Sequence, residues 1–341
     1  MKNTTLLDAS VLLATPTSRA RDIFVGDASA RKSLYRRLVS RWHPDHNADP
    51  QAHEVFIHLS RLFEALGADS AQLTFHAENG RIFSFQPQAQ GSFELGQWYR
   101  GKGSLVYLTD RKHRAAHDAF TTRVRSLAYA HSEMRKQISP CLPNMHSIQT
   151  GPNGQLIVLK RDPEGICLAD LMEYLHARGE IVEPRHVAWI VSSLHNLACY
   201  LETQGIAHHG IATTNVWINP RLHRSEILGG WFHSLPFGDR IRTLPSQVAQ
   251  HAPRAYLDAR TASGRLDLES IRGIGRTLLG DASGMRMNPS TPSALIDALR
   301  LPAHGSAIEE YRRWQQALLA SFGPPKFVEM KLSYRNIYTG E

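Results

Sequence analysis

The sequence is poor in cysteine and has no long apolar run. Its three cysteines, Cys141, Cys167 and Cys199, lie 26 and 32 residues apart, a spacing that excludes a disulfide scaffold and offers no paired ligands for a structural zinc. The apolar stretch at residues 6–14 is interrupted by Asp8 and is too short to cross a membrane. It also lacks the basic flank of a signal peptide, so we expect a cytoplasmic protein with no membrane partner.

Acidic residues are fewer than basic ones, and the imbalance is local. The 341 residues carry 39 Lys and Arg against 31 Asp and Glu, a formal net charge of +8. Nine basic and only three acidic residues lie within residues 100–136, which leaves a net +6 in that stretch. The hydrophobic fraction, 42%, is ample for a folded core. At this length we expect two domains.

Two amphipathic helices joined by a short polar loop are predicted near the N-terminus. The first helix repeats apolar residues at Leu34, Leu38 and Trp42, the spacing of one helical face. Its other face carries basic residues and no acid, among them Lys32, Arg36, Arg37 and Arg41. The second helix is predicted over residues 51–66. The intervening loop contains His43-Pro44-Asp45, Asn47 and Pro50, and its prolines exclude helical geometry.

This basic helix, the His43-Pro44-Asp45 tripeptide with Asn47, and the following helix resemble a J-domain, the module with which co-chaperones stimulate ATP hydrolysis by DnaK-type chaperones. The resemblance implies that Asp45 engages the chaperone's polar network, while His43 and Pro44 set the shape of the loop. It implies docking of the basic face, with its residues Lys32, Arg36, Arg37 and Arg41, on an acidic surface of the chaperone. The sequence departs from the family in its first helix, which is reduced to residues 21–25.

The rest of the chain predicts an α+β domain with strands first and helices second. Strands are expected at residues 73–76, 81–85, 94–98, 105–109, 145–149 and 155–159, and helices at 115–136, 168–178 and 184–204. That order suggests two lobes. We therefore divide the chain into an N-terminal tail (1–19), the small all-α J-domain-like hairpin (20–69), an N-lobe (70–165), a C-lobe (166–325) and a C-terminal tail (326–341).

A loop after the long predicted helix resembles the catalytic loop of the protein-kinase fold. His208 and Asn215 stand at the family's His and Asn, but Gly210 stands where the catalytic Asp belongs. Gly229 replaces the Asp of the kinase Asp-Phe-Gly motif. Asp267 matches the buried Asp that supports the catalytic loop in kinases.

These replacements argue against phosphoryl transfer, which needs one Asp to orient the hydroxyl and another to hold magnesium. The strand at residues 105–109 lacks the nucleotide-binding Lys, and Thr121, Thr122 and Arg123 stand where an ion-pairing Glu is expected. We therefore expect a pseudokinase, not an enzyme, and no cofactor. Binding of ATP and magnesium stays open, because Asn215 could still contribute a metal ligand.

The basic patch of Arg111, Lys112, Arg114, Arg123 and Arg125 has two interpretations. It is either a solvated face or a binding site for an acidic protein or nucleic acid. Aromatic residues, which would favour single-stranded nucleic acid, are sparse along it.

Three functions follow from these observations. The first is a J-domain co-chaperone that stimulates a DnaK-type chaperone, with the inactive kinase-like domain selecting a client protein. The second is an atypical ATP-binding transferase of kinase-like fold. The third is a nucleic-acid-binding adaptor, or one that a phage uses for host takeover. The short connection at residues 67–72 suggests that the two domains are held in one orientation.

Overall fold

The computed structural model describes residues 7–26, 28–66, 72–303 and 305–339. They form an N-terminal helical unit and a larger two-lobed domain, each with its own hydrophobic core. The predicted boundary at residues 69 and 70 lies outside the described residues. None of the helices in the described part of the chain is both long and apolar enough to cross a bilayer.

The N-terminal unit is all helical. It comprises α1 (Ala9–Leu13), the short 3-10 turn η1 (Thr17–Arg19), α2 (Ala20–Ile23), α3 (Ala28–Arg41) and α4 (Ala52–Leu66). Leu38 and Trp42 from the α3 side pack against Val55, Leu59 and Leu62 of α4. Ala9 and Leu12 of α1 belong to the same core. Within the segment predicted as an N-terminal tail (1–19), α1 is helical and packs on α4. The division of the chain into domains stays a prediction.

The N-lobe is built on an antiparallel sheet of five strands in the order β3-β4-β5-β7-β6. Its strands are β3 (Ala89–Phe93), β4 (Gly96–Gly101), β5 (Ser104–Asp110), β6 (Asn144–Gly151) and β7 (Gly154–Lys160). A separate hairpin, β1 (Leu73–His76) with β2 (Ile82–Phe85), packs beside it, with Phe75 against Val106 and Leu156. The single strand predicted at residues 94–98 is wrong: two strands turn at Glu94 and Leu95.

Helices cover one face of this sheet. The single helix predicted at residues 115–136 is instead two, α5 (Arg114–Arg125) and α6 (Ser132–Ile138), preceded and followed by the turns η3 (Arg111–His113) and η4 (Ser139–Cys141). The break falls at residues 126–131, where α6 begins anew with His131 as its cap. Phe120 of α5 is fully buried, so α5 is anchored to the interior between the lobes.

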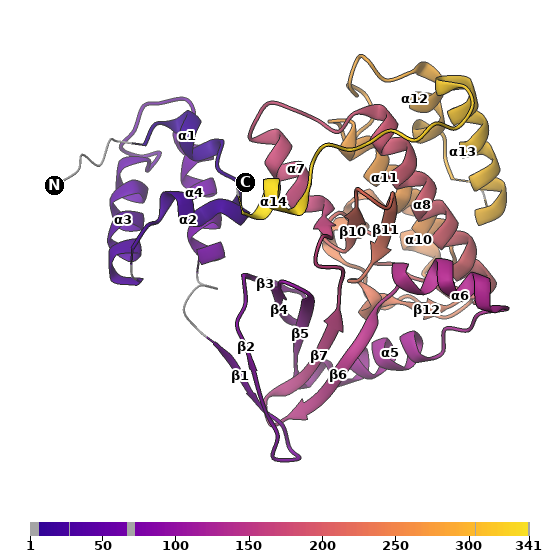
Figure 1. Ribbon diagram of the computed structural model, residues 1–341, viewed down its shortest axis with the longest axis horizontal. Helices are drawn as coiled ribbons and strands as arrows, with labels where there is room; N and C mark the ends of the chain where they lie inside the picture. The colour runs from indigo at the N-terminus through magenta and orange to yellow at the C-terminus, as the bar shows by residue number, and fades with distance from the viewer. Residues whose placement is uncertain (1–6, 27, 67–71, 304, 340–341) are drawn as a thin grey trace.

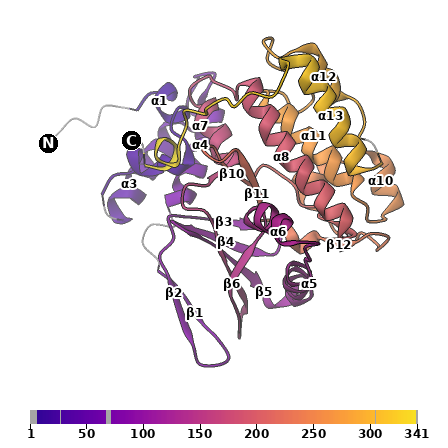
Figure 2. The same cartoon turned by 45° about the vertical axis from the view of Figure 1, so that its right-hand side comes forward.

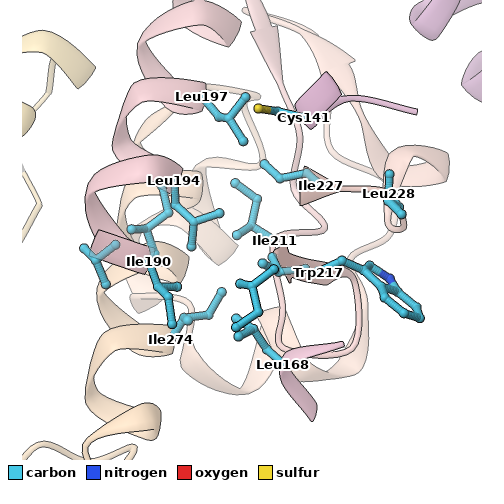
Figure 3. Packing of buried hydrophobic residues seen from close by; sticks show 14 of the residues in the cluster. Cys141, Leu168, Ile190, Leu194, Leu197, Ile211, Trp217, Ile227, Leu228 and Ile274 are labelled. Carbon is cyan, nitrogen blue, oxygen red and sulfur yellow. The ribbon is translucent and has the colours of Figure 1, made fainter. Parts of the chain in front are cut away.

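The C-lobe is mainly helical. Its helices are α7 (Leu168–His176), α8 (Pro184–Thr203), α9 (Ser246–His251), α10 (Arg254–Ala259), α11 (Arg265–Leu278), α12 (Ser293–Arg300) and α13 (Ala307–Phe322). Its short strands are β8 (Ile166–Cys167), β9 (Ile206–Ala207), β10 (Val216–Asn219), β11 (Arg224–Ile227) and β12 (Leu235–Pro236), with the turn η5 (Trp231–His233). Ile190 and Leu194 of α8 meet Ile274 of α11 in the core, while the Trp217 ring extends away from these aliphatic side chains (Figure 3).

The chain ends beside the N-terminal unit. After α13 an extended segment runs back across the C-lobe to α14 (Tyr334–Tyr338), which lies next to α7 and η1 (Figure 1). Figure 2 shows the same proximity of α14 to the N-terminal helices from a second direction. The helix near the end of the described chain thus lies against η1 of the N-terminal unit.

Candidate functional site

The loop between α3 and α4 is ordered by its own hydrogen bonds. The carbonyl of His43 accepts from the backbone N–H groups of His46 and Asn47, both at 3.0 Å. The Asn47 amide donates to the carbonyl of Arg41 at 3.0 Å and accepts from the Asp49 N–H at 2.9 Å. Asn47 thus satisfies an end carbonyl of α3 and shapes the turn.

The acidic member of the tripeptide is exposed, with its carboxylate 3.7 Å from Nδ1 of His43. The His43 ring packs edge-on against Phe56 of α4, with centroids 5.1 Å apart, and its Nδ1 accepts from the Asp45 N–H at 3.2 Å. The Asp45 side chain is 75% exposed. Pro44 is exposed as well. The loop therefore presents the Asp45 carboxylate to solvent from a backbone that is ordered by its own hydrogen bonds.

The basic face of α3 lies beside this loop and turns toward solvent. Lys32, Arg36 and Arg37 are exposed, while Arg41 is partly buried over the Trp42 ring. In Figure 1, α3 lies at the outer edge of the N-terminal unit and α4 lies between it and the two-lobed domain. The predicted docking surface is therefore not covered by the rest of the described chain.

In the two-lobed domain, the loop that contains His208 and Asn215 keeps the supports of a catalytic loop. The Asp267 carboxylate accepts the backbone N–H groups of His208 and His209, both at 2.7 Å. The His208 Nδ1 accepts from the Gly210 N–H at 3.1 Å, and its ring packs edge-on against Trp231. Buried backbone donors need such partners, so the frame of the loop survives without a catalytic carboxylate.

The two glycines that the resemblance places at acidic positions, Gly210 and Gly229, lie close to neighbouring atoms. A Cβ built on Gly210 would lie 2.5 Å from the carbonyl oxygen of Gly230. A Cβ built on Gly229 would lie 2.6 Å from the Tyr107 hydroxyl and 2.3 Å from Oδ1 of Asn215. These distances are shorter than a carbon atom tolerates. At Gly210 the obstructing atoms are backbone, whereas at Gly229 the Asn215 and Tyr107 side chains would have to move before a carboxylate could fit.

Aromatic side chains and an acid line the cleft between the lobes. Phe93 of β3, Tyr107 of β5 and Phe232 of η5 form a cluster with centroids 5.4 Å apart, and Phe120 stacks on Phe232 at 4.8 Å. At the tip of the β3–β4 hairpin, the Glu94 carboxylate accepts the Ser246 N–H at 3.2 Å. This contact joins the two lobes across the mouth of the cleft.

The connection between the lobes is held by Arg161. Its guanidinium donates to the carbonyls of Gly101 at 2.9 Å, Asp162 at 2.8 Å and Gly165 at 3.1 Å. It also lies 4.8 Å above the Trp217 ring. The carbonyls and the aromatic face at this connection are therefore occupied by a side chain of the same protein.

A cavity of about 420 Å³ remains between these groups, lined among others by Tyr107, Asn215 and Phe232. The kinase fold implies magnesium and ATP here. Two features oppose that pair: an acid, Glu94, lines the cavity, and Tyr107 and Asn215 crowd the Gly229 position. Among the described residues, no three His, Cys, Asp or Glu side chains gather into a possible metal site.

Comparisons with known proteins divide the chain in the same way. No family model matches the sequence. It is 36% identical over 78 residues to DnaJ homolog subfamily C member 16 of Gallus gallus, a match that covers 21% of this chain and 10% of that protein. It is 37% identical over 70 residues to the chaperone protein DnaJ of Dictyoglomus thermophilum, covering 20% of this chain and 17% of that protein. These matches fall in the helical unit.

The two-lobed domain is similar to a solved kinase domain. The crystal structure of the BubR1 kinase domain superposes with a TM-score of 0.54 at 12% identity, covering 74% of this chain and 84% of that one. The chain is a J-domain joined to a protein-kinase-like fold. The predicted α+β fold class, with a helical hairpin before two lobes, is confirmed. The chain spans only a small part of the DnaJ relatives, so their activities do not transfer to it as findings.

Several residues of the kinase-like cleft were not foreseen from the sequence. The cleft and its edges are filled by Tyr107, Glu94 and Arg161. Of these, only Tyr107 lies on a strand that the sequence analysis singles out, the strand expected to carry a nucleotide-binding Lys. Thr121, at the expected Glu position, is buried and donates to the Asp118 carbonyl at 3.0 Å. The α5 residue that reaches Phe232 is its neighbour Phe120.

The predicted basic patch lies on η3 and α5 of the kinase-like N-lobe. Arg111, Lys112, Arg114 and Arg125 are exposed, and Arg123 is partly buried. Lys112 lies 3.4 Å from Asp110, and Arg114 lies 3.6 Å from Asp118, pairs that stabilise little at a surface. Nucleic-acid binding by this patch stays a prediction.

The buried histidines of the kinase-like loop predict acid sensitivity. Burial lowers the pKa of His208 to about 3 and that of His209 to about 4, below the ordinary value of about 6.5. The unfolded chain takes up protons below pH 6.5 while the folded protein does not, so the free energy of unfolding falls as the pH decreases. From pH 7 to pH 5 we expect these two histidines to contribute a loss of roughly 4 kcal/mol. His195, whose pKa burial lowers to about 3, adds to the loss, whereas Asp267, whose pKa burial raises to about 7, opposes it. Urea unfolding at each pH measures the sum.

The matched variant is His209→Asn. His209 has a positive φ of 56°, a conformation that asparagine tolerates. The variant lacks one titrating group, so its loss of stability over the same pH range should be roughly 2 kcal/mol smaller than that of the wild type. Equal pH dependence in both proteins would contradict the assignment to this loop.

Proposed function

We propose that this protein is a J-domain co-chaperone whose kinase-like domain is catalytically inactive and binds or selects a client protein. The observation that carries the proposal is the loop at His43-Pro44-Asp45, which presents an exposed carboxylate beside an exposed basic helix face. A basic face favours fast docking on an acidic surface. The partner would be a DnaK-type chaperone, which carries the ATPase.

The orientation of the J-domain supports this proposal. Its α4 helix and N-terminal segment face the kinase-like domain, whereas α3 lies on the opposite side (Figure 1). Thr17 of η1 donates its backbone N–H and its hydroxyl to the Glu173 carboxylate of α7, at 2.9 and 2.6 Å. A chaperone could therefore dock on α3 while a client occupies the kinase-like domain.

The test is single-turnover ATP hydrolysis by a bacterial DnaK-type chaperone with and without this protein. Stimulation that saturates with added protein is the expected result. Because the attraction is between charged surfaces, the concentration needed for half-maximal stimulation should rise with salt. No stimulation at any salt concentration would contradict the co-chaperone role.

Inactivity of the kinase-like domain is the second part of the proposal, and it supports a prediction. We expect millimolar ATP with magnesium to leave the melting temperature unchanged, compared with magnesium alone. A ligand at a hundred times its Kd would add about 2.7 kcal/mol of stability, enough to raise the melting temperature by roughly 5 °C or more. A magnesium-dependent rise of that size would favour the atypical transferase instead.

A further inference from the structure

The C-terminal segment occupies the edge of the cleft where the two lobes are joined. In α14, the Tyr338 hydroxyl donates to the Asp170 carboxylate of α7 at 2.6 Å and accepts the backbone N–H of Cys167 at 3.1 Å. Tyr334 donates to Oε1 of Gln88 at 3.1 Å. One short helix thus bonds to the C-lobe through one tyrosine and to the N-lobe side through the other.

An ion pair between the lobes lies beneath the Tyr338 ring. Arg100 of β4 is only 5% exposed, and it pairs with Asp170 of α7. The Arg100 guanidinium lies 4.2 Å from the centre of the Tyr338 ring. A buried cation needs its partner and further contacts to offset desolvation, and Tyr338 supplies both a hydrogen bond to the carboxylate and an aromatic face to the cation.

This ion pair lies between two cavities. Arg100 and Asp170 line the cleft of about 420 Å³, and they also line a cavity of about 890 Å³ between the J-domain and the kinase-like domain. The larger cavity reaches His58 and Arg61 of α4. The Arg100–Asp170 pair therefore separates the two cavities, and the contacts of Tyr338 hold this pair in place.

The strap, as we name residues 326–339, is anchored in the core and also contacts the J-domain. Ile337 is fully buried and Met330 is 8% exposed, and both belong to the main hydrophobic core. Ser333 begins α14 with a capping box, its hydroxyl and backbone N–H both bonded to the Asn336 side chain. The helix also packs on η1, the segment through which Thr17 reaches Glu173.

We propose that the strap is an intramolecular clamp. Tyr338 binds at the edge of the cleft where the lobes are joined, which we call the hinge edge. Through this contact the strap holds the two lobes together over the cleft and also fixes the N-terminal segment of the J-domain. The hinge edge of the cleft is then occupied by a segment of the same protein, the strap. Loss of the Tyr338 contacts would open the cleft at Cys167 and loosen the J-domain at Thr17 together. This clamp does not depend on co-chaperone activity.

Cys167 offers a direct measurement in the full-length protein. Its thiol lines the cleft and is 6% exposed, and burial raises its pKa to about 12. Iodoacetamide reacts with the thiolate, so opening should accelerate labelling through both access and a lower pKa. We expect Tyr338→Ala to label at Cys167 about tenfold faster than wild type, with Cys141 in the C-lobe core unchanged.

Hydrogen exchange tests the coupling to the J-domain. In Tyr338→Ala, the amides of Cys167 and Thr17 should both exchange about tenfold faster. In Glu173→Ala, only the Thr17 amide should do so, because that change removes the acceptor of Thr17 and leaves Tyr338 in place. Thr339→Ala is the control, since its hydroxyl bonds only to the Arg335 carbonyl within α14.

Tyr338→Phe separates the clamp from general unfolding. It keeps the ring over Arg100 and removes only the hydroxyl, so Cys167 should still label and exchange faster than wild type while Cys141 does not. Unchanged behaviour of Cys167 in both Tyr338 variants would overturn the proposal. Equal acceleration at Cys167 and Cys141 in Tyr338→Phe would also overturn it, because it would indicate loss of the whole fold.

Discussion

The Asp45→Asn variant should lose nearly all stimulation of a DnaK-type chaperone's ATPase while remaining fully folded. Asp45 is 75% exposed, so its substitution changes a charge at the surface and removes no core contact. Surface changes of this kind alter stability by less than about 0.5 kcal/mol. An exposed carboxylate that pairs with a partner's buried polar groups is worth far more at the interface, about 2–5 kcal/mol, or roughly 30-fold or more in the stimulated rate.

The matched control lies four residues further along the same loop. Asp49 accepts the backbone N–H of Gln51 at 2.9 Å, and an asparagine oxygen can accept the same bond. Asp49→Asn removes the same charge from the same loop, so it should stimulate like wild type apart from a small salt-dependent change. Equal losses in the two variants would mean that net loop charge matters, and not the tripeptide.

Gly229→Asp, which places an acid where the resemblance expects a metal-binding Asp, should destabilise the kinase-like domain by about 2 kcal/mol or more and give no kinase activity. The new Cβ would lie 2.3 Å from Oδ1 of Asn215 and 2.6 Å from the Tyr107 hydroxyl. The new carboxylate would also be buried against these two oxygen atoms, and none of the three atoms nearest to the new Cβ belongs to a cation. Thermal unfolding of the variant, together with a phosphotransfer assay, tests both statements.

Gly305→Asp is the control for this substitution. A Cβ at Gly305 meets nothing within 4 Å, and an acid just before α13 is favourable to a helix start. Its melting temperature should be within about 2 °C of wild type. If Gly229→Asp were equally well tolerated, the cleft would be adaptable enough to regain a metal site.

The sequence predicted the parts of the fold that are local. The apolar spacing at Leu34, Leu38 and Trp42 and the prolines of the loop specify a helical hairpin without reference to distant residues. The positions of His208, Asn215 and Asp267 likewise follow from their order along the chain. The structure places these three in one loop and its support, although their roles in function stay predictions.

What the sequence did not predict depends on distant pairs or on weak local preferences. Strand β3 contains Gly91 and Ser92, which favour turns, and it forms because β4 pairs with it. The Tyr338 contact with Asp170 joins residues 168 positions apart, and no local sequence pattern predicts it. The crowding at Gly229 required the positions of Tyr107 and Asn215 in space.

The contact between η1 and α14 has a consequence for the order of events during synthesis. The J-domain emerges from the ribosome first, and its core is complete once α4 has been made. Its anchor on the hinge edge includes α14, which follows Thr17 by more than 300 residues. At roughly 5–20 residues per second, at least about 15 s separate the two. A nascent chain therefore carries a J-domain that lacks its contact with α14 for at least that time, while the Thr17–Glu173 contact can form as soon as α7 has been made.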